Sequence, residues 1–315
     1  MDLGVQIEPQ FGFAFDELVA IANDAERAGF TRYWVSDHFF LDPDSMATSC
    51  FEAWTLLAAL AVRTRSIRIG SMVTAQSYRN PALLAKIAAG VDVMSGGRLE
   101  FGLGAGWKDF EYRAYGYEFP SAADRVTQMN ECLEICTRMW SEDRATYRGK
   151  HYRIDDALCA PKPVQRPLPV WIGGKMPRVM RSAARSAHWF NLGGGVGARG
   201  PEAVAAAMRQ LDEICRAVKR DPKTLGRSVF LGCTVGADRK RADELVTQIV
   251  AERGSDGASW LAARPGYIAG APQEALARLR AFGRIGIAHV NLQLQPFGTE
   301  REQIAALAEI TPALR

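Results

Sequence analysis

The residue types that could do acid-base chemistry stand together at Asp37 and His38. Residues 33–35 (YWV) have the composition of a buried parallel strand, and the polar tip of Ser36, Asp37 and His38 follows directly. A histidine in such a place can give or take a proton near neutral pH. Asp37 could orient that ring or contact a ligand itself. The ordinary alternative is that Asp37 caps the next turn while a backbone carbonyl holds His38.

Two glycine-rich stretches are the second group of candidates. Residues 102–106 (GLGAG) run into Trp107, and a glycine pair precedes Lys175 just ahead of an expected helix start near Pro177. Exposed amide groups and a helix N-terminus suit a phosphate group, so we expect a phosphorylated ligand on Gly104, Ala105, Gly106, Gly173, Gly174 and Lys175. The first stretch does not match the dinucleotide fingerprint, because an aromatic residue and a loop follow it. Alternatively, these glycines only relieve crowding at the turns between strands and helices.

The elements that must position these residues alternate between apolar strands and helical segments. Eight strands are expected, and helices are expected in most of the intervals between them. The strands are at residues 3–7, 33–35, 67–73, 98–103, 170–172, 188–192, 228–235 and 289–294. This order predicts one α/β domain over residues 1–315, a (β/α)₈ barrel, interrupted by a short β-hairpin at residues 146–155. The carboxyl ends of the strands, including a glycine-rich loop at residues 193–197, would converge on one face. A doubly wound open sheet is the rival arrangement.

Composition and charge exclude several classes of function. Of the 315 residues, 48% are hydrophobic and 23% charged, which is typical of a packed globular protein, and the formal charge of +4 is scattered, which does not indicate nucleic acid. No apolar stretch is long enough to cross a membrane, and the first residues lack a basic and then apolar leader, so we expect a soluble, cytoplasmic protein. Six cysteines without a CxxC pair and four histidines indicate neither a metal site nor a disulfide framework.

An ordered series of motifs resembles the bacterial luciferase-like superfamily, and within it the deazaflavin (coenzyme F420)-dependent oxidoreductases. The resemblance covers most of the chain, and the series is much more specific than any one piece. Its pieces are residues 34–39 (WVSDHF), 70–74 (GSMVT), 79–86 (RNPALLAK), 91–98 (VDVMSGGR), 102–107 (GLGAGW), 115–120 (YGYEFP), Arg125, 162–165 (KPVQ) and 170–174 (VWIGG).

This resemblance implies a barrel that binds a deazaflavin at its carboxyl-end face and exchanges a hydride between F420 and a small organic substrate. It places His38 and Asp37 beside the ring, and it matches Ser71-Met72 to a site where the family often has a non-proline cis peptide behind the ring. The glycine loops with Lys175 would hold the cofactor phosphate, Thr74 and Trp107 would line the pocket, and Arg178 and Arg181 could form a basic rim. Relatives are often dimers, which implies a homodimer. The alternatives are a monooxygenase that uses reduced FMN and a non-catalytic barrel that binds a flavin.

The chain departs from some deazaflavin dehydrogenases of sugar phosphates at two positions. Those enzymes place a carboxylate directly after the glycine-rich loop, where this chain has Trp107, and a tryptophan shortly after the His tip, where it has residues 40–42 (FLD). A sugar phosphate is therefore not the expected substrate. The aromatic residues of the following loop indicate a flatter, less charged substrate, or else they only pack against one another. They are Trp107, Phe110, Tyr112, Tyr115 and Tyr117.

Overall fold

Eight parallel strands close into a barrel in the computed structural model, which describes residues 1–44, 48–193, 195 and 197–315. Each barrel strand pairs with the next around the ring, and the last pairs with the first. The predicted (β/α)₈ barrel is therefore confirmed, and the open-sheet alternative is wrong. The ring order is β1 (Asp2–Ile7), β2 (Arg32–Val35), β3 (Arg68–Ser71), β5 (Leu99–Gly104), β8 (Val170–Gly174), β9 (Trp189–Leu192), β10 (Gly226–Val235) and β12 (His289–Leu294).

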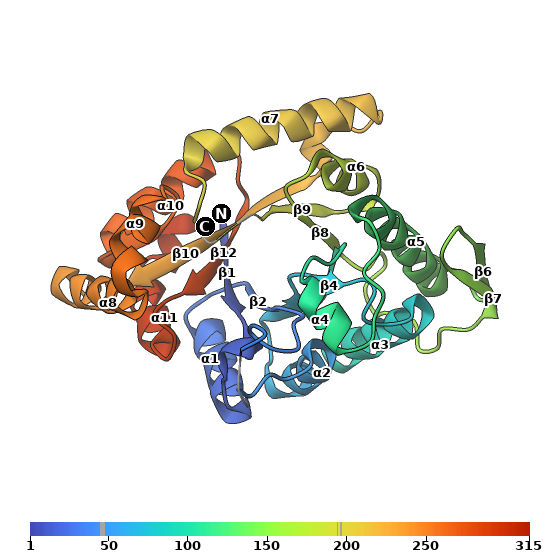
Figure 1. Cartoon of the computed structure of the whole chain (residues 1–315), viewed down its shortest axis with the longest axis horizontal. Helices are drawn as coiled ribbons and strands as arrows, with labels where there is room; N and C mark the ends of the chain where they lie inside the picture. Colours follow the sequence, from blue (N-terminus) through green and yellow to red (C-terminus); the bar gives the residue numbers. More distant parts are fainter. Residues whose placement is uncertain (45–47, 194, 196) are drawn as a thin grey trace.

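Helices surround this ring, as Figure 1 shows. Several begin where the sequence predicts: α3, for example, starts at Pro81, with the Asn80 Oδ1 atom accepting the Ala82 amide at 2.9 Å. The surrounding helices are α1 (Phe15–Arg27), α2 (Ala53–Arg63), α3 (Pro81–Met94), α5 (Ala122–Ser141), α6 (Pro177–Ser186), α7 (Pro201–Ala217), α8 (Arg239–Glu252), α10 (Pro272–Arg284) and α11 (Glu300–Ala308). Within the described ranges, none of the helices is long and apolar enough to cross a membrane.

Smaller elements interrupt the regular alternation. The predicted hairpin is confirmed as β6 (Ala145–Arg148) and β7 (Arg153–Ala157), an antiparallel pair beyond α5 at the edge of Figure 1. The sequence did not predict β11 (Ile268–Gly270), α4 (Asp109–Ala114) or α9 (Gly257–Ala262). Short 3₁₀ helices cover Pro9–Phe11, Pro222–Thr224, Gly254–Asp256 and Thr311–Leu314.

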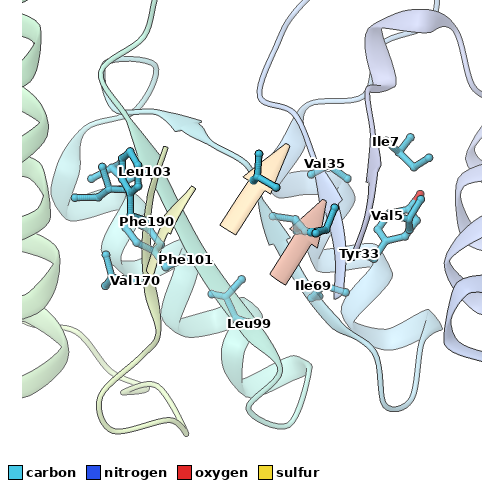
Figure 2. Close-up of a cluster of buried hydrophobic side chains, with 14 of the residues drawn as sticks. Val5, Ile7, Tyr33, Val35, Ile69, Leu99, Phe101, Leu103, Val170 and Phe190 are labelled. Carbon is cyan, nitrogen blue, oxygen red and sulfur yellow. The ribbon is translucent and has the colours of Figure 1, made fainter. Parts of the chain in front are cut away.

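Side chains on the barrel strands alternate between two environments. Apolar residues point outward into the core between strands and helices, and Figure 2 shows Val5, Ile7, Tyr33, Val35, Ile69, Leu99, Phe101, Leu103, Val170 and Phe190 in this layer. The intervening positions face the barrel axis and are polar, aromatic or glycine, as in the register that aligns Gln6 with Trp34 and Gly70. The barrel interior is therefore a column of polar, aromatic and glycine residues inside an apolar shell.

A buried charged cluster fills the amino-terminal end of this column. The Arg32 Nε atom donates to Glu100 Oε1 at 3.0 Å, and the indole of Trp171 donates to Glu100 Oε2 at 2.5 Å. The Arg32 guanidinium lies 5.1 Å from the ring centroid of Trp171 and 5.2 Å from that of Trp189. Burial and then Arg32 hold the pKa of His289 well below its usual range, so this imidazole is neutral. This cluster packs the lower barrel, which leaves the carboxyl end for a site.

The third strand ends earlier than predicted, and the chain then turns. The strand expected over residues 67–73 is divided into β3, ending at Ser71, and β4 (Thr74–Ala75), which pairs with β5. A cis peptide joins Met72 to Val73, so the expectation of a cis bond between Ser71 and Met72 is wrong by one residue. The reason is that the Met72 amide still donates to the Val35 carbonyl at 2.9 Å, so the chain leaves the strand ladder only after Met72.

Candidate active site

The His38 imidazole is held by a carboxylate that lies far from it in sequence. Its Nδ1 atom lies 2.9 Å from the Oε2 atom of Glu111, a residue of α4. The His38 side chain retains 16% of its exposure, whereas the Glu111 side chain is fully buried. The imidazole is therefore partly accessible, beside a carboxylate that is completely enclosed.

The Glu111 carboxylate is ionised and saturated with donors. The Phe39 amide donates to its Oε1 atom at 2.9 Å, and the Tyr78 hydroxyl donates to Oε2 at 2.8 Å. Burial opposes ionisation, but the hydrogen bonds from His38, Phe39 and Tyr78 together hold the pKa of Glu111 below its usual value. Because a carboxylate only accepts, the shared proton belongs to His38 Nδ1, and in the neutral ring Nε2 carries the free lone pair. The arrangement makes His38 Nε2 a proton acceptor.

Asp37 does not orient His38, contrary to one of the two expectations for it. Its Oδ1 and Oδ2 atoms accept both ends of the Arg79 guanidinium, at 2.9 and 2.8 Å, and Oδ2 also accepts the Ala75 amide at 3.0 Å. Arg79 bonds Glu52 as well. The physical reason is that the buried Asp37 carboxylate needs a cation, and the fork of Arg79 supplies it in two parallel bonds. Asp37 fixes the segment after β4 to the end of β2.

Val73 and the Ser71 carbonyl fill the space that three glycines leave open. A Cβ atom on Gly104 would lie 2.4 Å from Val73 Cγ2, and one on Gly173 would lie 2.9 Å from Val73 Cγ1. One on Gly102 would lie 1.8 Å from the Ser71 carbonyl oxygen. The crowding explanation therefore accounts for these glycines, since the segment of Ser71, Met72 and Val73 needs their room. Met72 and Val73 themselves remain half-exposed, so they form a floor at the mouth.

Trp107 and Thr74 were both expected to line the pocket, but one is exposed and the other is buried. The Trp107 side chain is 70% exposed, and its ring meets the His38 ring edge to face with centroids 5.8 Å apart. Thr74 is fully buried, and its hydroxyl accepts the Trp54 indole N–H at 3.2 Å. Trp107 is thus at the site, whereas Thr74 supports it from within because its side chain is fully buried.

The aromatic residues of the loop after Trp107 also divide into buried and exposed rings. Tyr112 is fully buried, and a Cβ on Gly106, which has φ +78°, would lie 1.8 Å from the Tyr112 hydroxyl oxygen. Tyr115 is exposed and stacks on Phe39 with centroids 4.0 Å apart. The packing interpretation holds for Tyr112, whereas two rings of the loop are exposed: Trp107, against His38, and Tyr115, against Phe39.

The second glycine stretch leads into a helix N-terminus that has no side-chain cap. Gly173 and Gly174 end β8 and are half-exposed, and Lys175 is exposed ahead of α6. The first turn of α6 has no acidic residue, and Met176 makes no side-chain cap bond. Free amides at a helix start and a nearby ammonium suit an anion. Arg178 and Arg181 are exposed on the same helix, while Gly194 and Val196 of the expected mouth loop at residues 193–197 lie outside the described residues.

The sequence did not single out Glu8, Arg79, Lys108 or Glu111. Burial raises the pKa of Glu8, and the positive charges of His38 and Lys108 oppose this rise. The available signal for Glu111 was its place between Phe110 and Tyr112, because a lone carboxylate among aromatics is expected to have buried partners. No local signal pairs it with His38.

A cavity of about 620 Å³ lies at the opposite end of the barrel and contains none of the predicted site residues. Its lining comes from the amino ends of β1 and β9 and from the carboxyl end of the chain, and includes Asp2, Trp189, Arg280, Arg284 and Leu314. The chemistry-bearing side chains described above are therefore a feature of the carboxyl face, as expected for a barrel of this kind.

Comparison with known proteins gives a consistent result. A family model described as luciferase-like monooxygenase matches residues 1–311. An F420-dependent glucose-6-phosphate dehydrogenase of Amycolatopsis mediterranei is 28% identical over 95% of this chain and 94% of its own. An F420-dependent hydroxymycolic acid dehydrogenase of Mycobacterium tuberculosis is 32% identical over 73% of this chain and 62% of its own. A solved F420-dependent secondary alcohol dehydrogenase, in complex with an F420-acetone adduct, superposes with a TM-score of 0.82 at 22% identity, covering 100% of this chain and 99% of that one.

Proposed function

The chain belongs to the luciferase-like monooxygenase family, and from that premise we propose that it is an oxidoreductase that transfers a hydride between coenzyme F420 and a small organic substrate. The observation that carries the proposal is the 2.9 Å contact between His38 Nδ1 and Glu111 Oε2 beside the half-exposed floor of Met72 and Val73. A hydride transfer to or from a carbon bearing oxygen needs a proton acceptor or donor at that oxygen. His38 Nε2 supplies it.

The residues present fit a deazaflavin. The floor of Met72 and Val73 lies over Gly104 and Gly173, where any larger residue would displace Val73. The Ser71 side chain is fully buried in register with Val35, which points into the outer core, so we assign Ser71 the role of supporting the floor from behind. The uncapped start of α6 with Lys175 would take the phosphate. When bound, F420 supplies the hydride chemistry.

This chain's own residues would then do three things. Glu111 fixes the His38 tautomer through Nδ1, so that Nε2 takes the substrate hydroxyl proton in the oxidative direction and returns it in the other. The Asp37–Arg79 pair holds the segment that carries the floor. Trp107 covers the His38 edge of the site with an apolar surface that excludes water from one side of the substrate.

The direct test is a side-by-side titration of the purified protein with F420 and with FMN, followed by fluorescence. We expect F420 to bind at micromolar or lower concentration and FMN to bind at least tenfold more weakly. If FMN binds more tightly than F420 and the protein with reduced FMN consumes oxygen, the monooxygenase is favoured instead. The variant Lys175→Met should weaken F420 about tenfold and leave the phosphate-free deazaflavin core unaffected, because only the phosphate contact is lost. Glu118→Gln, an exposed change in the same half of the barrel, is the control.

A sugar-phosphate dehydrogenase is the second candidate, favoured by one observation at the far side of the mouth. The Arg253 and Arg264 guanidinium groups lie 3.6 and 3.9 Å from the ring centroid of Trp260, and the buried Arg264 Nε has no partner among the described residues. Burial lowers the pKa of both arginines, and for Arg264 the charge of Arg253 lowers it further. Two such cations suit an anionic group, whereas Trp107 suits an apolar one. Bleaching of F420 with glucose 6-phosphate, compared with an uncharged secondary alcohol, decides between them.

We also propose that the enzyme works as a homodimer in the cytoplasm. Helices α2 and α3 leave four apolar side chains exposed, Val62, Leu83, Val93 and Met94, which a second copy would cover. All six cysteines are free thiols, as expected in a reducing compartment. Sedimentation should give a dimer mass, and Leu83→Glu on the exposed face of α3 should shift it towards the monomer without unfolding the chain.

A further inference from the structure

Lys108 is a buried lysine whose ammonium joins two segments around His38. Its Nζ atom donates to the carbonyls of Phe40 and Leu41, at 3.2 and 2.9 Å, and lies 3.7 Å from Glu111 Oε1. The residue is only 7% exposed. Lysines are seldom buried unless they are paired, so this one is held for its charge.

Two carboxyl groups act on the His38 ring, Glu111 and Glu8, although burial raises the pKa of Glu8 and so opposes its ionisation. Glu111 contacts the ring directly, and Glu8 interacts electrostatically with both His38 and Lys108. The other titratable groups close to the ring are neutral or already paired. The pKa of Cys50 is raised to about 12 by burial and Glu111, the pKa of Tyr78 is raised well above its usual value by burial and Glu111, and Asp37 is bound to Arg79.

We propose that Lys108 is a positioning residue of this site: its ammonium ties Glu111 to the segment after His38 and weakens the negative potential that the Glu8 and Glu111 carboxyl groups place on the His38 ring. The proposal rests on the function proposed above, in which His38 Nε2 accepts a proton. Without the ammonium, two carboxylates would favour the imidazolium, which has no lone pair and is no base.

This role differs from that of a simple clamp on residues 40 and 41. A clamp requires hydrogen bonds to the two carbonyls, and its loss would alter the stability of the loop. A charge-balancing role also depends on Glu8, which makes no hydrogen bond to Lys108 among the contacts of the described residues. The two roles are separated by a change at Glu8, which removes a charge and leaves the carbonyl bonds intact.

The test follows the imidazole C–H resonances of the protein without cofactor by NMR across pH, with His38→Gln identifying the signal among four histidines. In Lys108→Met, we expect the proton affinity of His38 to rise about tenfold, since one nearby charge typically has an effect of this size. Lys108→Arg should stay within about twofold of the parent, because the charge is kept. Glu8→Gln should move the affinity downward, and the double variant Lys108→Met/Glu8→Gln should return towards the parent.

The proposal is overturned if Lys108→Met leaves the His38 titration where it was, or if Lys108→Arg behaves like the methionine variant. Should Lys108→Met fail to fold, Lys108→Gln, which keeps a hydrogen-bond donor for the two carbonyls but carries no charge, takes its place. With F420 and a substrate, the acidic limb of kcat/KM should move in the same direction as the NMR titration in each variant. Because the NMR arm uses no cofactor, absence of F420 binding would reject the proposed function and leave the result on Lys108 standing.

Discussion

The His38 Nδ1 atom lies 2.9 Å from Glu111 Oε2, although 73 positions separate the two residues in the chain. The carboxylate also accepts the amide of Phe39, the residue after His38, at 2.9 Å. Glu111 thus hydrogen-bonds both the His38 ring and the backbone next to it. A histidine held at Nδ1 by a carboxylate has a fixed tautomer and a fixed orientation, which is what a proton acceptor at Nε2 requires.

Replacing Glu111 by Gln should lower kcat/KM by about 10²-fold, with F420 affinity within twofold of the parent. Glutamine keeps the shape but removes the charge that selects the tautomer. Steady-state assays of F420 bleaching measure the rate, and fluorescence titration measures the affinity. Glu118→Gln, on an exposed residue seven positions on, should match the parent. An unchanged rate in Glu111→Gln would mean that this carboxylate only holds the loop.

Removing the partner of Asp37 should destabilise the fold strongly. Arg79→Met leaves a buried carboxylate without its cation, and we expect a loss of about 3 to 5 kcal/mol in the free energy of unfolding, measured with urea. The double variant Asp37→Asn/Arg79→Met should recover part of it. Arg138→Met, which breaks an exposed pair with Glu134, should cost far less, because solvent screens that pair. Equal losses at both sites would contradict a special role for the buried pair.

Gly104→Ala should displace Val73 from the floor and weaken F420 binding at least tenfold, because the added Cβ would lie 2.4 Å from Val73 Cγ2. Shortening the obstructing side chain in Gly104→Ala/Val73→Ala should restore much of the affinity. The matched control is Gly90→Ala in α3, where nothing lies within 4 Å of the new Cβ, and stability should rise by about 0.5 to 1 kcal/mol. If the double variant binds no better than Gly104→Ala, Val73 is not the obstacle.

Glu300, at the start of α11, should make the fold less stable as the pH rises. Burial, with Glu17 nearby, raises its pKa from 4.5 to about 7, and its Oε1 atom has no partner among the described residues. Because the folded-state pKa is the higher one, its contribution is complete below pH 4.5 and is lost as the pH rises through 7. Between pH 5 and 8, Glu300→Gln should therefore gain up to about 3 kcal/mol on the parent in urea unfolding.

The neighbouring carboxylate gives the control for that comparison. Glu302 pairs with Arg241, whose hydrogen bond lowers the pKa of Glu302, so Glu302→Gln should gain nothing on the parent between pH 5 and 8. If the difference in unfolding free energy between Glu300→Gln and the parent stays constant across this range, Glu300 is ionised throughout and its pKa is not raised.

The order of strands and helices was determined by the sequence itself. Alternating apolar residues in segments such as residues 289–294, and the Asn80-Pro81 start of α3, act over a few neighbouring positions, so they can be recognised without the fold. The three-residue β11 and the six-residue α4 are too short for such a period, and the end of β3 depends on the bond between the Met72 amide and the Val35 carbonyl.

For the site, the sequence by itself determined that His38, Trp107 and the glycine stretches stand at the ends of strands. Only the tertiary structure decided which charges meet: Arg79 takes Asp37, and Glu111 takes His38. The physical reason is that helix caps and strand periodicity arise from neighbours in the chain. The pairing of buried charges depends instead on which side chains are brought within about 3 Å when the barrel closes, where an unpaired charge is too costly to leave.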